Sequence, residues 1–146
     1  IGYLKNEEET SKTIVDGWLK TGDLGYLDDD GYLFILDRKK ALIIRGGENI
    51  SCIEVESAIA EHQAFREVAV FGIPDERLGE VLCAAICSEN SNLIDDQAIK
   101  SFLADKLAAF QIPEHIIIFD EALPKIASGK FSKPEMRDNF VTSLKK

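Results

Sequence analysis

Residues 68–88 read VAVFGIPDERLGEVLCAAICS, and this stretch decides the fold of the chain. It contains two apolar runs, Val68–Ile73 and Val81–Ser88, in which β-branched residues are frequent. A polar segment with a proline and a glycine, residues 74–79, separates the two runs. Short apolar runs of this composition, bounded by turn residues, are typical of β-strands. We therefore predict two strands joined by a polar connection.

The cysteines of this stretch support the same interpretation. Cys83 and Cys87 are an even number of residues apart, so on a strand they share one face. Together with Cys52 they are odd in number, and no C-x-x-C pair is present. This pattern favours reduced thiols packed in a core over a disulfide framework or a metal site.

Helical patterns flank the two strands. Ser51 followed by Glu54 is a capping-box arrangement, which marks the start of a helix. After Asp95, apolar residues recur at helical spacing until Pro113, which ends the pattern. The elements predicted around the two strands are a helix at about 52–61, a helix that ends at Pro113, a strand at Ile116–Phe119 and a short polar helix at about 134–140. We therefore predict an α+β fold in which helices flank a small mixed sheet.

A separate β-hairpin precedes this core. The tetrapeptide Asp28–Gly31 lies between the apolar runs Tyr26-Leu27 and Tyr32–Leu36, and an Asp-Gly pair in such a place is a strong hairpin signal. A further strand, Leu42–Ile44, ends at the glycine pair 46–47, where the backbone is free to adopt positive φ. We expect the hairpin to belong to a different structural unit from the core.

Composition limits the classes of function. The 146 residues are enough for one compact domain with an appendage, at roughly 100 to 200 residues per domain. The formal net charge of −9 disfavours nucleic acid as a partner. No apolar run approaches the roughly 20 residues of a membrane-spanning helix, and no signal peptide is recognised, so we expect a cytoplasmic protein. The chain begins with Ile1 and not Met, which we interpret as a start inside a larger protein.

Three segments place charged residues beside glycine in predicted loops. Asp23 could accept hydrogen bonds from a sugar diol, or it is a turn carboxylate bonded to its own backbone. Arg38 and Lys130 could each bind a phosphate or carboxylate, or they are solvated surface charges. Lys130 follows a glycine, but the full phosphate-binding pattern G-x-x-x-x-G-K-[ST] is absent. His62 and His115 have no Ser or Cys partner in a recognisable arrangement, and we interpret both as structural.

Short motifs containing these residues occur in order along the chain. They are GYL at 2–4, DGWLKTGDLG at 16–25, DRKK at 37–40, GGENI at 46–50, EVE at 54–56, LPK at 123–125 and SGK at 128–130. In this order and at this spacing they resemble the adenylate-forming superfamily, which comprises acyl-CoA synthetases, peptide synthetase adenylation domains and luciferases. The resemblance runs from about Gly2 to Phe140.

The resemblance implies the C-terminal portion of an ATP-dependent carboxylic acid:CoA ligase that forms an acyl-adenylate and then an acyl-CoA thioester. ATP with Mg²⁺, and CoA, would be substrates of the full-length enzyme, and none would be tightly bound to this chain. By resemblance, the site residues are the catalytic Lys130, the ribose-binding Asp23 and Arg38, the hinge residue Lys40, and Gly46 and Gly47 at the pantetheine tunnel.

The resemblance also implies a domain division. Residues 1–39 would be the tail of a large N-terminal AMP-binding domain, and residues 40–146 the mobile C-terminal domain. The large domain would be the partner of this chain, which would be inactive alone. The motif GGENI resembles CoA synthetases more than peptide synthetase modules. The alternatives are a peptide synthetase type adenylation module and a noncatalytic binding module. Three positions depart from the usual pattern, Ala41, Cys52 and Gln111, and the last bears on a contact to CoA phosphate.

Overall fold

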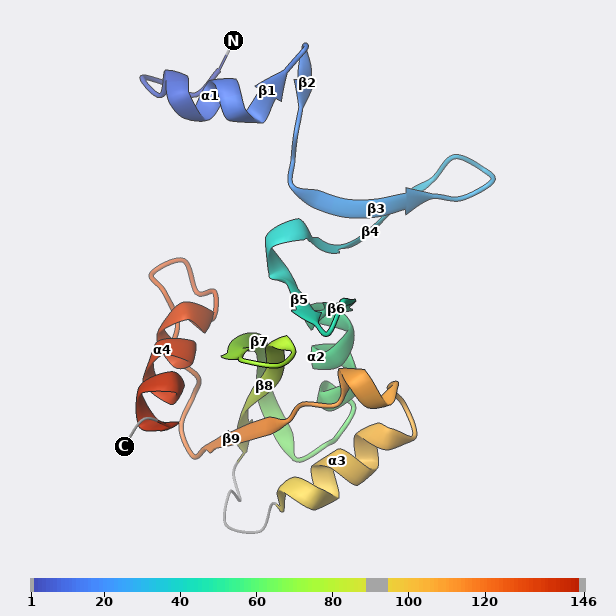
Figure 1. The fold of residues 1–146 in the computed structure, drawn as a ribbon, viewed down its shortest axis with the longest axis vertical. Coiled ribbons are helices and arrows are strands. Elements are labelled where there is room, and N and C mark those ends of the chain that lie inside the picture. Colours follow the sequence, from blue (N-terminus) through green and yellow to red (C-terminus); the bar gives the residue numbers. More distant parts are fainter. Residues whose placement is uncertain (1, 89–94, 145–146) are drawn as a thin grey trace. The chain divides into compact units, whose positions relative to one another are not determined.

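The chain folds into two compact units, Ile1–Lys40 and Ala41–Lys146. The structure is a computed structural model, and it describes residues 2–88 and 95–144 (Figure 1). Among these residues, no helix is long and apolar enough to cross a membrane. Each unit is built around its own strands, so the two are described in turn.

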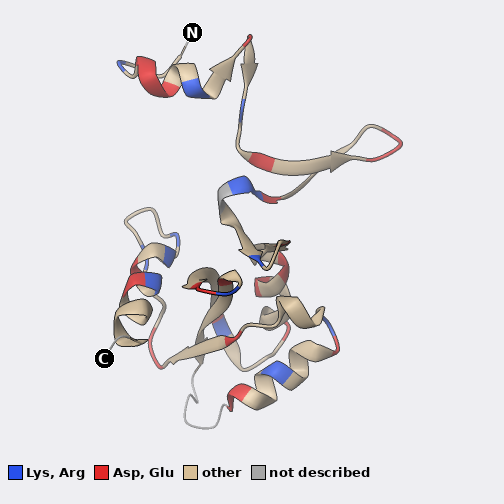
Figure 2. Cartoon of the chain, in the orientation of Figure 1, with Lys and Arg blue, Asp and Glu red and all other residues tan. Residues whose placement is uncertain are grey.

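The first unit contains short elements and the predicted hairpin. The elements are helix α1 (Glu7–Thr13) and strands β1 (Ile14–Val15), β2 (Trp18–Leu19), β3 (Asp23–Leu27) and β4 (Leu33–Arg38). Strands β3 and β4 pair antiparallel, as predicted. The Asp28 side chain closes their loop, because its Oδ1 accepts from the Asp30 and Tyr32 amides at 3.1 and 2.8 Å. Figure 2 shows the acidic tip of this loop.

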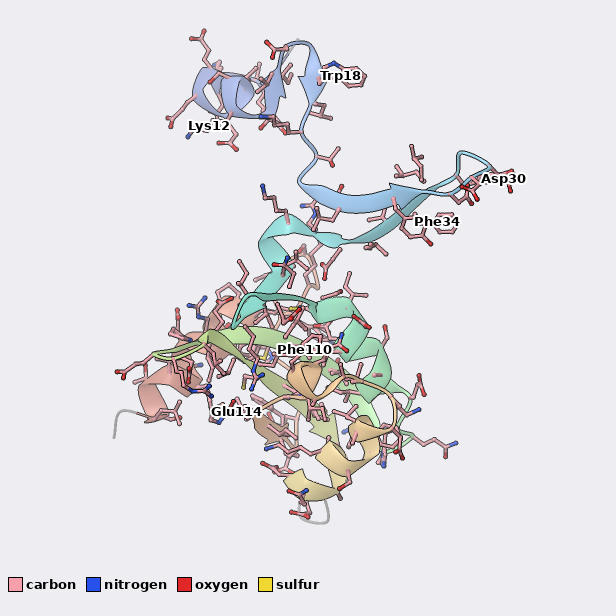
Figure 3. The ribbon with its side chains drawn as sticks, turned by 45° about the vertical axis from the view of Figure 1, so that its right-hand side comes forward. Lys12, Trp18, Asp30, Phe34, Phe110 and Glu114 are labelled. Atoms are coloured by element: carbon pink, nitrogen blue, oxygen red, sulfur yellow. The ribbon has the colours of Figure 1, made fainter. Side chains whose placement is uncertain are left out.

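The β3–β4 hairpin has little core of its own. Most of its apolar side chains are exposed, from 45% for Phe34 to 68% for Tyr32, and Trp18 on β2 is 79% exposed (Figure 3). Phe34 stacks on Tyr26 with the ring centroids 5.1 Å apart. A two-stranded hairpin of this kind is marginally stable in water without further packing.

A mixed sheet forms the centre of the second unit. Its strands are β5 (Leu42–Arg45), β6 (Glu48–Ser51), β7 (Phe65–Asp75), β8 (Gly79–Ser88) and β9 (His115–Phe119). The strand order is β6-β5-β8-β7. Strand β5 pairs with β8 at one position only, Arg45 with Gly79. Strand β9 pairs with β8 in parallel, from Cys83 to Cys87 of β8. Strands β7 and β8 are the pair predicted from residues 68–88, with β7 beginning three residues earlier.

Helices cover both faces of the sheet (Figure 1). Helices α2 (Cys52–Ala60) and α3 (Asp96–Ala104) pack on one face, and α4 (Lys133–Leu144) packs on the other. Side chains of β8 therefore alternate between two cores: Leu82, Ala84 and Ile86 enter one, and Val81, Cys83, Ala85 and Cys87 enter the other. This explains why the strand is apolar throughout, and it confirms the predicted α+β class and the shared face of the two cysteines.

The start of α2 follows the predicted capping. The Ser51 hydroxyl accepts from the Glu54 amide at 3.3 Å. Val55 and Ile59 are then fully buried one turn apart, and each such side chain contributes roughly 1.5–3 kcal/mol. His62, just beyond the helix, stacks on Phe65 at 4.4 Å between ring centroids, in agreement with a structural interpretation.

The predicted long helix ending at Pro113 is wrong. Helix α3 ends at Ala104, and a separate 3-10 turn, Ala109–Gln111, follows. The Leu103 carbonyl accepts from the amides of both Lys106 and Leu107, which closes the last helical turn. The Gln111 side chain then accepts from the Ala108 amide at 3.0 Å, so the chain turns before it reaches the proline. Helix α4 is longer than predicted at both ends.

Candidate functional site

Asp23 and Arg38 meet across the β3–β4 hairpin. They are direct partners in the register, and Arg38 Nε donates to Asp23 Oδ1 at 2.7 Å. The Asp23 amide donates to Thr21 Oγ1 at 3.1 Å. The Asp23 side chain is 27% exposed, whereas Arg38 is 70% exposed. The carboxylate is therefore held in one orientation by an arginine that still faces solvent.

The chain leaves this pair through a tightly bonded segment. Asp37 is 3% exposed, and its Oδ1 accepts from the Arg38 amide at 2.6 Å. The Lys39 amide donates to the Gly22 carbonyl at 2.8 Å, which ties the two ends of the hairpin together. Lys40, the predicted hinge residue, lies in the 3-10 turn Lys39–Ala41 at the boundary of the two compact units.

Gly46 and Gly47 form the two-residue turn between β5 and β6. Their φ angles are +58° and +94°, and the flanking Arg45 and Glu48 are register partners. Positive φ at both turn positions is the geometry of a type I′ hairpin turn, which favours glycine. A Cβ at Gly47 would meet nothing within 4 Å. The backbone of Gly47 is therefore not covered by other atoms of the chain on the side where a Cβ would lie.

The β7–β8 connection supports the glycine turn. The Leu78 carbonyl accepts from the Gly46 amide at 2.8 Å. Asp75 shapes the connection, because its Oδ1 accepts from the amides of Leu78 and Arg77 at 2.7 and 2.9 Å. These bonds hold the pKa of Asp75 below its ordinary value. The sequence indicated only a polar connection here, so this support was missed.

Arg45 lies next to the glycine turn. Its guanidinium is 3.5 Å from Glu114 Oε2, and its Nε is buried without a hydrogen-bond partner among the described residues. Glu80 Oε2 accepts from the Ile44 amide at 3.1 Å and thereby bridges β8 to β5. Within the part of the chain that the structure describes, no group of three or more His, Cys, Asp or Glu side chains is arranged to hold a metal ion.

Lys130 lies at the end of a tight turn between Leu123 and α4. The Gly129 amide donates to the Ile126 carbonyl at 2.9 Å, and the Ile126 amide donates to the Lys130 carbonyl at 2.9 Å. Gly129 has a φ of +82°. This is the pattern of a three-residue hairpin loop with glycine in the left-handed position. The Lys130 side chain is exposed on this turn.

The structure therefore brings only some of the predicted residues together. Asp23 and Arg38 form one ion pair in the first unit. The glycine pair 46–47 and Lys130 lie on two different turns of the second unit. Each of these turns is exposed and closed by backbone hydrogen bonds, as suits loops that approach a ligand.

Comparison with known proteins identifies the family. The family model for the AMP-binding enzyme C-terminal domain matches residues 54–130, just over half of the chain. The chain therefore belongs to this family, and the predicted resemblance is confirmed. The matched segment begins at Glu54 on α2 and ends at Lys130.

Curated relatives carry a similar sequence as the C-terminal part of longer proteins. The 2-succinylbenzoate–CoA ligase of Listeria monocytogenes is 45% identical over 94% of this chain and 29% of its own length. The long-chain-fatty-acid–CoA ligase FadD13 of Mycobacterium tuberculosis is 40% identical over 99% of this chain and 28% of its own length. The chain thus spans less than a third of the relatives that it matches.

A solved structure agrees with the fold. The o-succinylbenzoate CoA synthetase MenE of Bacillus subtilis, in complex with its acyl-adenylate intermediate OSB-AMP, superposes with a TM-score of 0.85. It is 37% identical, and the match covers 94% of this chain and 28% of that protein. The likeness extends over both compact units.

Proposed function

We propose that this chain is the C-terminal part of an ATP-dependent carboxylic acid:CoA ligase. Residues 1–39 would be the tail of a large N-terminal AMP-binding domain, and residues 40–146 the mobile C-terminal domain. The observation that carries the proposal is the match of 94–99% of the chain to proteins named CoA ligases, at 40–45% identity. The large exposed apolar surface of the β3–β4 hairpin fits a segment that packs against a further domain.

The first reaction would join the acid to AMP. A carboxylate oxygen of the acid attacks the α-phosphorus of ATP, and pyrophosphate leaves with the electrons of the broken P–O bond. Two anions approach each other in this step, so a nearby ammonium group stabilises the transition state. We assign this role to Lys130, whose exposed position on a tight turn lets it enter a site on another domain. Loss of one such donor costs roughly 2.7–4 kcal/mol.

Asp23 and Arg38 would bind the ribose of the nucleotide. A carboxylate offers two acceptor oxygens, enough for both hydroxyls of a sugar diol. The bond from Arg38 Nε to Asp23 Oδ1 holds the carboxylate in place. ATP would arrive with Mg²⁺, and both would be bound chiefly by the large domain.

The second reaction would transfer the acyl group to CoA. The CoA sulfur attacks the acyl carbonyl carbon, AMP leaves, and the thiol proton is released. The bare backbone at Gly46 and Gly47 suits close passage of the pantetheine arm, since a side chain would obstruct it. Lys40 would be the hinge at which the C-terminal domain changes position between the two reactions.

The residues that select the acid would lie in the large domain, outside this chain. Relatives of nearly equal similarity are named for 2-succinylbenzoate and for long-chain fatty acids. A peptide synthetase type module would use a carrier-bound thiol in place of CoA, and a binding module of this fold would do no chemistry. The CoA ligase names of the relatives favour CoA.

A panel of acids tests the proposal. Pyrophosphate release by the full-length protein would be measured with short, long and aromatic acids, each with CoA, with a phosphopantetheinylated carrier protein, or with neither. We expect acyl-CoA formation with one class of acid, and no reaction from this chain alone. Turnover only with the carrier would favour the peptide synthetase module. Absence of adenylation with every acid would favour the binding module.

A further inference from the structure

The turn that bears Lys130 has little apolar packing of its own. All six residues from Lys125 to Lys130 are exposed. Backbone bonds within the turn fix its shape but do not fix its place on the domain. A lysine that must meet a phosphate group to within about an ångström needs the whole turn to be anchored, because a 1 Å displacement can cost about a hundredfold in rate. The anchors must therefore lie at the two ends of the turn.

Glu67 anchors the entry to the turn. It lies on β7, 58 residues away from Lys125 in the sequence, and its Oε1 pairs with Lys125 Nζ. Its Oε2 accepts from the Leu123 amide at 2.7 Å, and Leu123 is itself buried in the core beneath α4. The Glu67 side chain is only 21% exposed. Both carboxylate oxygens thus hold the segment that leads to Lys130.

Glu56 anchors the exit from the turn. It lies on α2, and its Oε1 is 2.7 Å from Nζ of Lys133, three residues after Lys130. The same oxygen accepts from the Val70 amide of β7 at 2.8 Å. Glu56, Glu67 and Phe131 line one groove of about 290 Å³ beside β7. The two carboxylates therefore hold opposite ends of the same segment from neighbouring elements.

We propose that Glu67 and Glu56 are positioning residues for Lys130, and that they act specifically on acyl-adenylate formation. This inference rests on the proposed function. Exposed ion pairs are usually worth little, about 0–1 kcal/mol. These two differ because each carboxylate is mostly buried and also accepts a backbone N–H. Their effect is expected on the placement of the turn more than on the stability of the domain.

Three single glutamine variants of the full-length protein test the proposal, together with Lys130→Ala and one double variant made in the Lys130→Ala background. Glu67→Gln and Glu56→Gln keep an acceptor oxygen but remove the charge that holds a lysine. Glu61→Gln is the control, because it removes the ion pair between Glu61, the C-cap residue of α2, and Lys106, which is not part of the Lys130 segment. Each variant would be assayed for pyrophosphate exchange, for thioester formation from supplied acyl-adenylate, and for thermal unfolding.

The expected result separates positioning from folding. In Glu67→Gln the kcat of adenylation falls about tenfold, whereas KM and thioester formation from acyl-adenylate are nearly unchanged and Tm falls only slightly. Glu56→Gln shows a similar loss of adenylation. Glu61→Gln behaves as the wild type. In a Lys130→Ala background, Glu67→Gln causes no further loss, since there is no ammonium left to position.

Two outcomes would overturn the inference. One is an unchanged adenylation rate in Glu67→Gln and in Glu56→Gln. The other is a loss of rate in Glu67→Gln that is equal in both half-reactions, or one that adds fully to the loss caused by Lys130→Ala. A structural defect would produce either of these patterns. Failure of the proposed function is recognised separately: Lys130→Ala itself would then leave adenylation unchanged.

Discussion

The φ angles of the glycine turn between β5 and β6 predict how much stability each glycine substitution costs. Gly47 has a φ of +94°, outside the left-handed region that other residues tolerate, and a Cβ there would meet nothing. The cost of Gly47→Ala is therefore purely one of backbone strain, about 2 kcal/mol. Gly46 has a φ of +58°, inside that region, so Gly46→Ala should cost about 1 kcal/mol.

A control variant sharpens this comparison. Gly46→Asn creates the Asn-Gly pair that type I′ turns prefer, so it should cost close to nothing. Its Cβ would lie 3.2 Å from Leu78 Cδ2, the flexible end of a side chain that has to move by only a few tenths of an ångström. The expected order of stability is therefore wild type and Gly46→Asn, then Gly46→Ala, then Gly47→Ala.

Urea denaturation followed by far-UV circular dichroism measures these differences. The single tryptophan, Trp18, and all three tyrosines lie in the first unit, so fluorescence would not report on the second. With a slope of about 2 kcal/mol per molar urea, Gly47→Ala should lower the midpoint by about 1 M. If Gly47→Ala and Gly46→Asn share one midpoint, the argument from φ is refuted.

Three further predictions follow from individual side chains. Burial raises the pKa of Cys83 to about 12, so this thiol should resist a thiol reagent at neutral pH and react once urea unfolds the chain. Pairing with Lys125 and the bond from the Leu123 amide lower the pKa of Glu67 below its ordinary 4.5. The ionised side chain therefore stabilises the fold above pH 4.5, and this contribution is lost as the pH falls further. In Glu67→Gln the free energy of unfolding should depend less steeply on pH below 4.5. Asp23→Asn should weaken AMP binding to the full-length protein by about tenfold to a hundredfold, measured by calorimetry, because hydrogen bonds to charged groups contribute about 1.5–3 kcal/mol.

The core of the second unit was predictable because its signals are local. The apolar runs of β7 and β8 are bounded by turn residues, and Ser51 caps α2 in the predicted way. Helix α1 was not predicted, since none of its residues is buried and it shows no apolar period. The end of α3 was misplaced because Leu107 and Phe110 continue the apolar pattern while the Leu103 carbonyl and Gln111 turn the backbone.

The residues proposed for the site were named from the sequence, but the contacts that support them could not be predicted. The hairpin predicted around Asp28–Gly31 does not by itself place Asp23 opposite Arg38, because that pairing depends on a register shift between Leu24 and Gly25. The contacts of Glu67 with Leu123 and Lys125 join positions 56 and 58 residues apart, and no local pattern predicts such pairs. The same holds for the bond between Gly46 and Leu78.

The most direct test of the proposed function is to compare the two half-reactions in Lys130→Ala. The variant should fold normally, since the side chain is exposed, and it should lose about a hundredfold to a thousandfold in acyl-adenylate formation. Thioester formation from supplied acyl-adenylate should stay within a few-fold of the wild type. An adenylation rate within about threefold of the wild type would contradict the assignment of Lys130 to the chemistry.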